Sequence, residues 1–356
     1  MSQTPYCSKS LGLGEGGFVN PPLQDWAQQA APLRERGSMT DSGTDALDGK
    51  HVVVLGFARQ GKALARWLPT IGAQVTVSDM LITAALASEL GEFAGLPVQF
   101  ALGGHPLELL DDCDLLCVSG GVPLTLPIIQ EAFGRGLPVT NDAQLFLERC
   151  PAPVLGITGS AGKTTTTSLV GAMCRASGRR TFVGGNIGDV LLDVLPQING
   201  QDIVVMELSS FQLEIMTVSP DVAAVLNVTP NHLDRHGTMD AYSAAKAQIY
   251  MHQTPDDVAV FGYDDPVAEQ MSHHAPGRVA YFSMRSPVMS GAYLKGRELV
   301  VVGDSSPGAE WRTVCGRDQI RLRGDHNVAN TLAACAVAGA GGISPEAMRR
   351  AIESFT

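Results

Sequence analysis

Residues Gly156–Ser168 read GITGSAGKTTTTS, and this stretch decides the fold around it. The apolar run Pro153-Val154-Leu155 leads into it, and an apolar helical pattern follows from Leu169. A buried strand, a glycine turn, Lys-Thr and a helix in that order form a phosphate cradle, because backbone N–H groups and the positive helix end converge on an anion. The strict phosphate-loop spacing asks for glycine where Ile157 stands, so an ordinary glycine turn remains an alternative.

The loop also supplies side chains suited to a nucleotide. Lys163 would place a point charge at the β- and γ-phosphates, and Thr164 would offer a hydroxyl to a magnesium ion. The expected cofactor contacts in this stretch are Gly159, Ser160, Gly162, Lys163, Thr164 and Thr165. We therefore expect ATP and Mg²⁺ as cofactors.

Length and composition limit the class of protein. The 356 residues are enough for two or three domains, and 45% hydrophobic residues suit a globular chain with filled cores. The net charge of −11 argues against a nucleic-acid partner. An apolar run of about 18 residues, which a membrane span requires, is missing. Seven scattered cysteines without a C-x-x-C pair favour reduced thiols, hence a cytoplasmic protein, and a monomer is the working expectation.

The chain falls into three segments. Residues 1–48 are rich in Gly, Ser, Pro, Gln and Asp, which predicts a disordered leader. Residues 49–150 alternate short β-branched runs with helical patterns, which predicts an α/β domain with a Rossmann-like parallel sheet. Residues 151–356 begin a second α/β unit with the phosphate loop.

The second unit is expected to end in a small antiparallel patch and two helices. Strands are predicted at 292–295, 298–302 and 320–323, with Gly296 in a hairpin turn. Asp325 is expected to cap an alanine-rich helix to about Ala340. Ser344 and Pro345 are expected to open the last helix.

A glycine turn and two polar residues in the first domain are candidates for ligand contact. The turn Gly56–Gly61 resembles a dinucleotide fingerprint but has Ala58 in place of the middle glycine, so a structural turn is an equal alternative. Asp79 ends the second predicted strand, where a carboxylate often reads a ribose or base, although a cap would also explain it. Ser119 ends the fourth predicted strand at the same edge.

Further candidates follow strands of the second domain. Glu207 ends a buried run and could hold magnesium, with Ser209 and Gln212 beside it, while a helix cap is the simpler role for Ser209. His232, in a polar loop, could bind a metal or orient a phosphate. From spacing alone, Lys246 is a solvated surface lysine.

Asparagines supply the remaining candidates. Asn186, between glycines, could present an amide to an anion such as a pyrophosphate, or could simply form a turn. Asn327 and Asn330 are three residues apart at a helix start and share one face, which suits reading of an adenine edge.

Taken together, these stretches resemble the Mur ligase family. The motifs are GITGSAGKTT, GGNIG, ELSSFQLE, NVTPNHLDRH with AAK, and GDHNVAN, in order over about residues 50–356. The run from Glu207 to Glu214 is most similar to the D-glutamate-adding members. Other Mur ligases, folylpolyglutamate-type ligases and a nucleotide-binding module without ligase chemistry remain alternatives.

The resemblance implies a reaction and its partners. An N-terminal domain would bind the UDP end of UDP-N-acetylmuramoyl-L-alanine, and a central domain would bind ATP. The substrate carboxylate would attack the γ-phosphate to give an acyl phosphate, and D-glutamate would then displace phosphate to form an amide. This is a step of peptidoglycan synthesis, on which cell shape and cell division depend.

The resemblance also assigns roles by position. Lys163, Lys246 and His232 would be catalytic, and Thr164, Glu207, His232 and Lys246 would hold metal, Lys246 as a carbamate. The expected substrate residues are Asp79, Ser119, Asn186, Ser209 and Gln212, and the adenine-side residues are Asn327 and Asn330.

Two departures from the family pattern are visible. The Ser119 loop reads SGGV where the family usually has Ser-Pro-Gly. The family's amino-acid-binding domain would follow a helix like 345–355, whereas this sequence stops at Thr356. We therefore expect a shortened ligase that binds UDP-N-acetylmuramoyl-L-alanine and Mg-ATP but, alone, ligates D-glutamate poorly or not at all.

Overall fold

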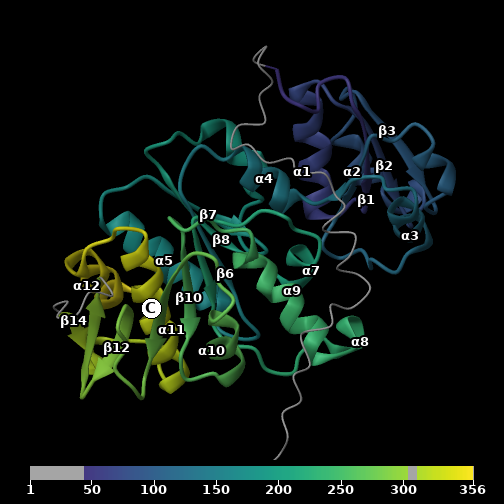
Figure 1. Ribbon diagram of the computed structural model, residues 1–356. Coiled ribbons are helices and arrows are strands. Elements are labelled where there is room, and N and C mark those ends of the chain that lie inside the picture. The colour runs from purple at the N-terminus through teal and green to yellow at the C-terminus, as the bar shows by residue number, and fades with distance from the viewer. Residues whose placement is uncertain (1–43, 304–310, 356) are drawn as a thin grey trace, which may run out of the picture.

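The computed structural model describes residues 44–303 and 311–355. Within these ranges the chain forms two sheets joined through a common core (Figure 1). The first sheet is parallel, with strand order β3-β2-β1-β4-β5. Its strands are β1 (His51–Leu55), β2 (Gln74–Asp79), β3 (Val98–Leu102), β4 (Leu115–Val118) and β5 (Val139–Thr140).

The second sheet has the order β14-β13-β12-β11-β10-β9-β6-β8-β7. Its parallel strands are β6 (Val154–Thr158), β7 (Thr181–Gly185), β8 (Ile203–Glu207), β9 (Val222–Val225), β10 (Val258–Gly262) and β11 (Arg278–Ser283). The strand β12 (Gly291–Lys295) pairs parallel with β11 and antiparallel with β13 (Glu298–Val302), which pairs with β14 (Trp311–Gly316). The predicted antiparallel patch is therefore the continuation of the large sheet.

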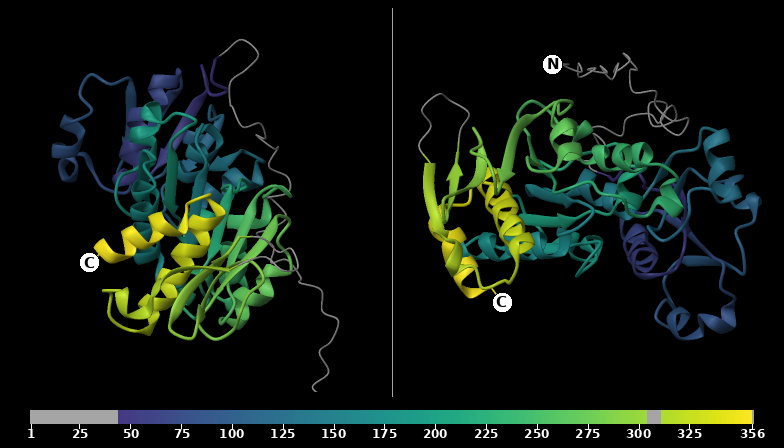
Figure 2. Two further views of the ribbon diagram at one scale, coloured as in Figure 1. Left: turned by 90° about the vertical axis from the view of Figure 1, so that its left-hand side faces the viewer. Right: turned by 90° about the horizontal axis from the view of Figure 1, so that it is seen from below.

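Helices pack against both sheets. The first domain contributes α1 (Arg59–Trp67), α2 (Ala87–Gly91), α3 (Pro127–Gly134) and α4 (Asp142–Arg149). The second contributes α5 (Lys163–Ala176), α6 (Leu191–Val194), α7 (Ser210–Leu213), α8 (Leu233–His236), α9 (Met239–Met251), α10 (Pro266–Ser272), α11 (Asp325–Ala340) and α12 (Pro345–Ser354). The last two helices lie beside α5, and their apolar side chains share one core with it (Figure 2).

A second core spans both sheets and fixes the first domain against the second. It contains Val54 and Val77 from the first sheet together with Val204 and Val225 from the large sheet. The helices α1, α4 and α6 contact one another in this region, and Figure 1 shows α4 between α1 and the strands of the large sheet. Because a packed interior has few rearrangements of similar energy, this shared core sets how the two sheets face each other.

Two local predictions are wrong. The third antiparallel strand is β14, whereas residues 320–323 are irregular. The buried Cys315 pairs with Leu299 of β13, the buried Val314 lies at the register shift beside it, and Gly316 then turns the chain into a short 3₁₀ helix. Asp325 does not cap α11, because Gly324 is the N-cap and Asp325 instead pairs with Arg317.

Other boundaries are confirmed. Ser344 caps α12, and Pro345 opens it. The predicted leader lies mostly outside the described residues, but its last part, 44–48, is described. There Leu47 is buried, and Asp45 forms an ion pair with Arg149. No helix in the described ranges is long and apolar enough to cross a membrane.

Candidate functional site

The phosphate loop lies at the carboxyl end of β6, between that strand and α5. Gly162 is the N-cap of α5, with φ of 84°. A Cβ at this position would lie 2.3 Å from Oδ1 of Asn330, so the loop requires glycine for both conformation and space. At Gly159 a Cβ would lie 2.9 Å from the Cβ of Leu226. The predicted strand, glycine turn and helix are therefore present in the expected order.

Asn227 and Ser160 hold the loop in shape. Asn227 Oδ1 accepts from the N–H of Ala161 at 2.9 Å, and Asn227 Nδ2 donates to the Ala161 carbonyl at 3.1 Å. Ser160 Oγ donates to the carbonyl of Thr229 at 3.0 Å and lies 3.1 Å from the hydroxyl of Tyr242. These bonds tie the loop to the segment after β9, so the cradle is organised by its own side chains.

Thr164 and Glu207 meet at the mouth of the loop. Thr164 Oγ1 donates to Glu207 Oε2 at 3.0 Å, and Asn186 Nδ2 donates to Glu207 Oε1 at 2.9 Å. Glu207 is only 1% exposed. Lys163 Nζ donates to the Gly159 carbonyl at 2.9 Å, and burial lowers the pKa of Lys163 while Glu207 opposes that shift. The strands β9, β6, β8 and β7 are neighbours, which is why their carboxyl ends gather these side chains.

Lys246 is buried beside the loop, so the surface position that spacing alone favours is wrong. It is 1% exposed, and its ammonium lies 3.5 Å from Thr158 Oγ1 and 4.5 Å from the ring centre of Tyr242. Burial, and secondarily the charge of Lys163, lower the pKa of Lys246 to about 7. A large fraction of this amine is therefore neutral near neutral pH.

His232 lies in the loop after β9, at the N-cap of α8. It is exposed and has a positive φ of 53°, and its ring is 5.2 Å from that of Phe211. The neighbouring His236 is enclosed, with Nε2 2.9 Å from Ser210 Oγ and its ring stacked on Phe211. Burial lowers the pKa of His236 to about 4, with a smaller contribution from Lys246. His236 is thus neutral and supports the Phe211 side of the site.

Asn327 and Asn330 are adjacent on the first turns of α11. Asn330 Nδ2 donates to Asn327 Oδ1 at 3.1 Å, and Asn327 Nδ2 donates to the Arg323 carbonyl at 2.8 Å. Because Asn330 lies over Gly162, this amide pair borders the phosphate loop. The sequence prediction that the two share a face is confirmed.

The first sheet gathers a separate set of groups at its own carboxyl edge. Asp79 Oδ2 accepts from the N–H of Phe57 at 2.7 Å, which holds the first glycine turn. Ser119 is buried, and its hydroxyl donates to the Gly56 carbonyl at 3.2 Å. A Cβ on Gly61 would lie 1.8 Å from the same carbonyl, so this turn also needs glycine. Asp79 and Ser119 thus flank one turn.

Ser209 and Gln212 lie between the two edges. They form a reciprocal capping box at the start of α7, so the cap expected for Ser209 is confirmed. Asn141 Nδ2 donates to the Gln212 carbonyl at 2.7 Å, and the side chain of Gln212 lies 3.6 Å from a Cβ placed on Gly120. This segment therefore connects the Ser119 loop with Glu207.

The donors near Glu207 fit a hard cation in part. A hydroxyl and a carboxylate from Thr164 and Glu207 are already adjacent, and oxygen donors are what Mg²⁺ prefers. Within 44–303 and 311–355, no cluster of three or more His, Cys, Asp or Glu side chains could hold a metal ion. A metal here would therefore need donors of another kind, such as water, phosphate or a modified lysine.

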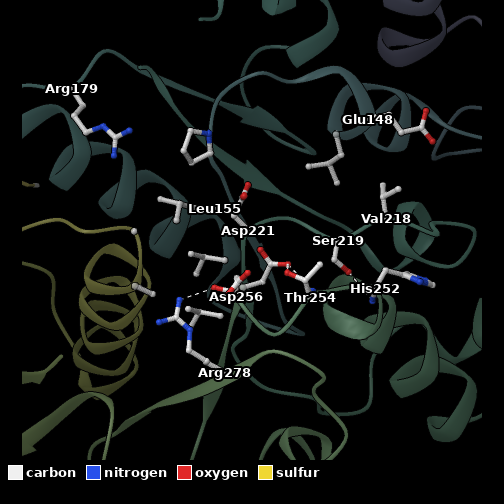
Figure 3. Close-up of a pocket in the computed structure, with 17 residues that line it drawn as sticks. Glu148, Leu155, Arg179, Val218, Ser219, Asp221, His252, Thr254, Asp256 and Arg278 are labelled. Atoms are coloured by element: carbon white, nitrogen blue, oxygen red, sulfur yellow. Dashed lines mark hydrogen bonds between the residues drawn. The ribbon is translucent and has the colours of Figure 1, made fainter. Parts of the chain in front are cut away.

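A cavity of about 710 Å³ lies at the opposite, amino edge of the large sheet (Figure 3). Its walls include Leu155 and Val222, near the starts of β6 and β9. Polar side chains that line the cavity form structural hydrogen bonds: Asp221 Oδ2 accepts from the N–H of Val154, and Arg278 donates to the Asp256 carbonyl. We therefore place the candidate site at the carboxyl edge rather than in this cavity.

Three residues of the site lay beyond the sequence reasoning. Asn227 and Tyr242 hold the loop, and Arg59 donates to three carbonyls of the Asn186 turn. Tyr242 could have been found, because it precedes Lys246 by four residues on one helix and must share its face. Arg59 is distant in sequence from its acceptors and leaves no local signal.

The structure thus brings a phosphate loop, a buried acid and a buried lysine together at the carboxyl edge of the large sheet. Residues 157–338 match the Mur ligase middle domain, and residues 50–141 match the N-terminal domain of Mur ligases like MurD. The chain belongs to the Mur ligase family.

Similar sequences sharpen this assignment. The chain is 39% identical over 307 residues to the UDP-N-acetylmuramoylalanine–D-glutamate ligase of Pelotomaculum thermopropionicum, covering 86% of this chain and 67% of that protein. It is 40% identical over 311 residues to the same ligase of Symbiobacterium thermophilum, with the same two coverages. The chain thus spans about two thirds of the length of these curated relatives.

Solved structures agree on the fold. The chain aligns with the UDP-N-acetylmuramate:L-alanyl-gamma-D-glutamyl-meso-diaminopimelate ligase from Neisseria meningitides. The TM-score is 0.58 at 17% identity, over 86% of this chain and 98% of that one. A murein peptide ligase from Psychrobacter arcticus aligns with a TM-score of 0.54 at 19% identity, over 86% of this chain and 68% of that one.

Proposed function

We propose that this chain carries the ATP site and the UDP-muramoyl site of a D-glutamate-adding Mur ligase. The main support is that Lys163, Thr164, Glu207 and Lys246 meet around one phosphate loop. The identity to D-glutamate ligases supports UDP-N-acetylmuramoyl-L-alanine as the acceptor. The proposal places the protein in the cytoplasm, in peptidoglycan synthesis, and extends to the cell division and cell shape that depend on it.

In the proposed reaction, the alanyl carboxylate forms a bond to the γ-phosphorus while the bond from that phosphorus to the β-phosphate oxygen breaks, releasing ADP. The nitrogen of D-glutamate then attacks the acyl carbon, the acyl–phosphate bond breaks, and phosphate and a proton leave. The physical difficulty is that two anions must approach each other, so positive charge must be concentrated there. Lys163 and the N-terminus of α5 provide it in this chain.

Mg²⁺ would supply further charge neutralisation when bound. Thr164 and Glu207 would hold it, and His232 and Lys246 would hold a second ion. Lys246 must first react with CO₂, which adds to a neutral amine and releases a proton to give an anionic carbamate. The pKa of about 7 supports this step, because it keeps much of the amine neutral. The neighbouring charge of Lys163 would also favour an anion at this position over a second ammonium.

Asp79 and Ser119 would contact the UDP end, and Asn186, Ser209 and Gln212 would contact the muramoyl-alanyl end. Gly159, Ser160, Gly162 and Thr165 would wrap the ATP phosphates. Asn327 and Asn330 would contact adenine, consistent with their place beside Gly162.

Thermal shift tests the substrate assignment. UDP-N-acetylmuramoyl-L-alanine should raise the melting temperature more than UDP-N-acetylmuramate or a folate, because only the alanyl precursor places its carboxylate at the loop. An equal or larger shift with another precursor would assign the chain to a different ligase of this family. Asp79→Asn should reduce the shift from the UDP precursor without reducing the shift from Mg-ATP.

A further inference from the structure

Arg59 connects the first domain to the turn that carries Asn186. It is the first residue of α1 and lies in the glycine turn of the first sheet. Its guanidinium donates to the carbonyls of Gly188 at 2.7 Å, Asn186 at 2.9 Å and Gly185 at 3.2 Å. Three donor bonds from one planar cation fix both the position and the orientation of that turn.

The turn is rigid where Arg59 holds it. Gly185 has φ of 100°, and a Cβ there would lie 2.4 Å from the carbonyl of Glu207. The backbone N–H of Asn186 donates to that carbonyl at 2.9 Å, and Asn186 Nδ2 donates to Glu207 Oε1 at 2.9 Å. A displacement of the turn would therefore move the amide that holds the Glu207 carboxylate.

Glu207 in turn contacts Thr164, the residue that follows Lys163 at the phosphate loop. Its second oxygen accepts from Thr164 Oγ1 at 3.0 Å. The contacts run from Arg59 through Asn186 and Glu207 to Thr164, so an arginine of the first domain is linked to the oxygen pair suited to a cation.

We propose that Arg59 is a positioning residue that holds the Asn186 turn, and through it Glu207, in the geometry that binds a nucleotide-bound divalent cation. The inference rests on the proposed function for the identity of the cation and nucleotide. It adds a part of the first domain to the cation site in the second. Arg59 touches neither reacting group in this account and acts only through Asn186.

The helix α1 offers a matched control. Arg66, on the same helix, also reaches the second domain, where it pairs with Asp193 at 2.9 Å. Both partners of that pair are partly exposed, and Asp193 lies on α6, outside the carbonyls of Gly185, Asn186 and Gly188 that Arg59 holds. Arg66→Gln thus removes an interdomain contact of the same helix without loosening Glu207.

The test is calorimetric titration of ATP into the whole chain, once with Mg²⁺ and once with EDTA. Arg59→Gln should weaken Mg-ATP binding about five- to ten-fold, the scale of one or two hydrogen bonds, and leave metal-free ATP binding unchanged. Arg59→Lys, which keeps the charge but not the planar fork, should lie between. Arg66→Gln should match the wild type under both conditions.

Several results would overturn the inference. An unchanged Mg-ATP affinity in Arg59→Gln would overturn it. An equal loss of ATP affinity with and without Mg²⁺ would also overturn it, because that would indicate a general structural effect. Loss of UDP-precursor binding with intact Mg-ATP binding would make Arg59 a ligand of the precursor instead. If wild type binds no Mg-ATP, both this inference and the proposed function fail. If Arg59→Gln loses affinity only for Mg-ATP but the wild type binds no muramoyl precursor, only the proposed function fails.

Discussion

Replacement of the buried Lys246 by methionine should change how the stability of the protein depends on pH. Methionine has a similar length and no charge, so the variant removes the buried ammonium with little change in packing. Lys246 is 1% exposed, and its pKa falls from 10.5 in the unfolded chain to about 7 in the fold. The folded state thus binds fewer protons than the unfolded state between these two values.

The magnitude follows from that shift. The lowering of the Lys246 pKa from 10.5 to about 7 corresponds to about 5 kcal/mol of destabilisation below pH 7. The cost shrinks as the pH rises towards 10.5, because the unfolded chain also loses its proton. From about pH 7.5 to about pH 9, wild type should therefore gain about 2 kcal/mol from this residue.

Urea unfolding in CO₂-free buffer at these two pH values is the assay. The Lys246→Met variant should be more stable than wild type at the lower pH. It should also lack the rise of about 2 kcal/mol that the linkage relation gives for wild type. Lys50→Met is the control, because the Lys50 side chain is 52% exposed. Equal pH slopes for wild type and Lys246→Met would refute the reasoning.

Three further changes have defined outcomes. Gly162→Ala should lower the free energy of unfolding by about 1–3 kcal/mol and weaken ATP binding, because of the positive φ and the clash with Asn330. The control Gly49→Ala, which has an open Cβ position, should lower the free energy of unfolding less and leave ATP binding intact. Burial raises the pKa of Asp142 to about 6, so between about pH 4.5 and about pH 7 the free energy of unfolding of wild type should fall by about 2 kcal/mol relative to that of Asp142→Asn, and parallel urea titrations of the two proteins measure this difference. Glu207→Gln should weaken ATP binding in calorimetry only when Mg²⁺ is present, and an equal loss in EDTA would argue against a role in holding the cation.

The overall order of elements could be predicted because its signals are local. The glycine turn, Lys163 and the flanking apolar runs lie within one short stretch, and alternating strands and helices imply parallel sheets. The error at 320–323 shows the limit of this reasoning. The alternation of apolar residues with arginine at 320–323 is typical of a strand, but Trp311–Gly316 pairs with β13 instead. Which segment pairs with the edge strand of a sheet depends on contacts with residues distant in sequence, and local alternation carries no information about them.

The candidate site was predictable only where residues end strands or share a helix face. Glu207 ends β8 and Asn186 follows the neighbouring β7, and the structure brings the two side chains together. The burial of Lys246 was different, since it depends on Thr158 and Tyr242 enclosing its amine. Arg59 was missed because its acceptors are more than a hundred positions away in the chain. The metal and substrate roles of these side chains stay predictions.

The most direct test of the central claim is titration of UDP-N-acetylmuramoyl-L-alanine into the chain saturated with a non-hydrolysable Mg-ATP analogue. The account predicts one-to-one binding of the precursor with the nucleotide still bound, because the two sheet edges offer separate sites joined at Glu207. Lys163→Met should lose the nucleotide and keep the precursor. Nucleotide binding with no response to the muramoyl precursor would contradict the account and leave a nucleotide-binding module without ligase chemistry.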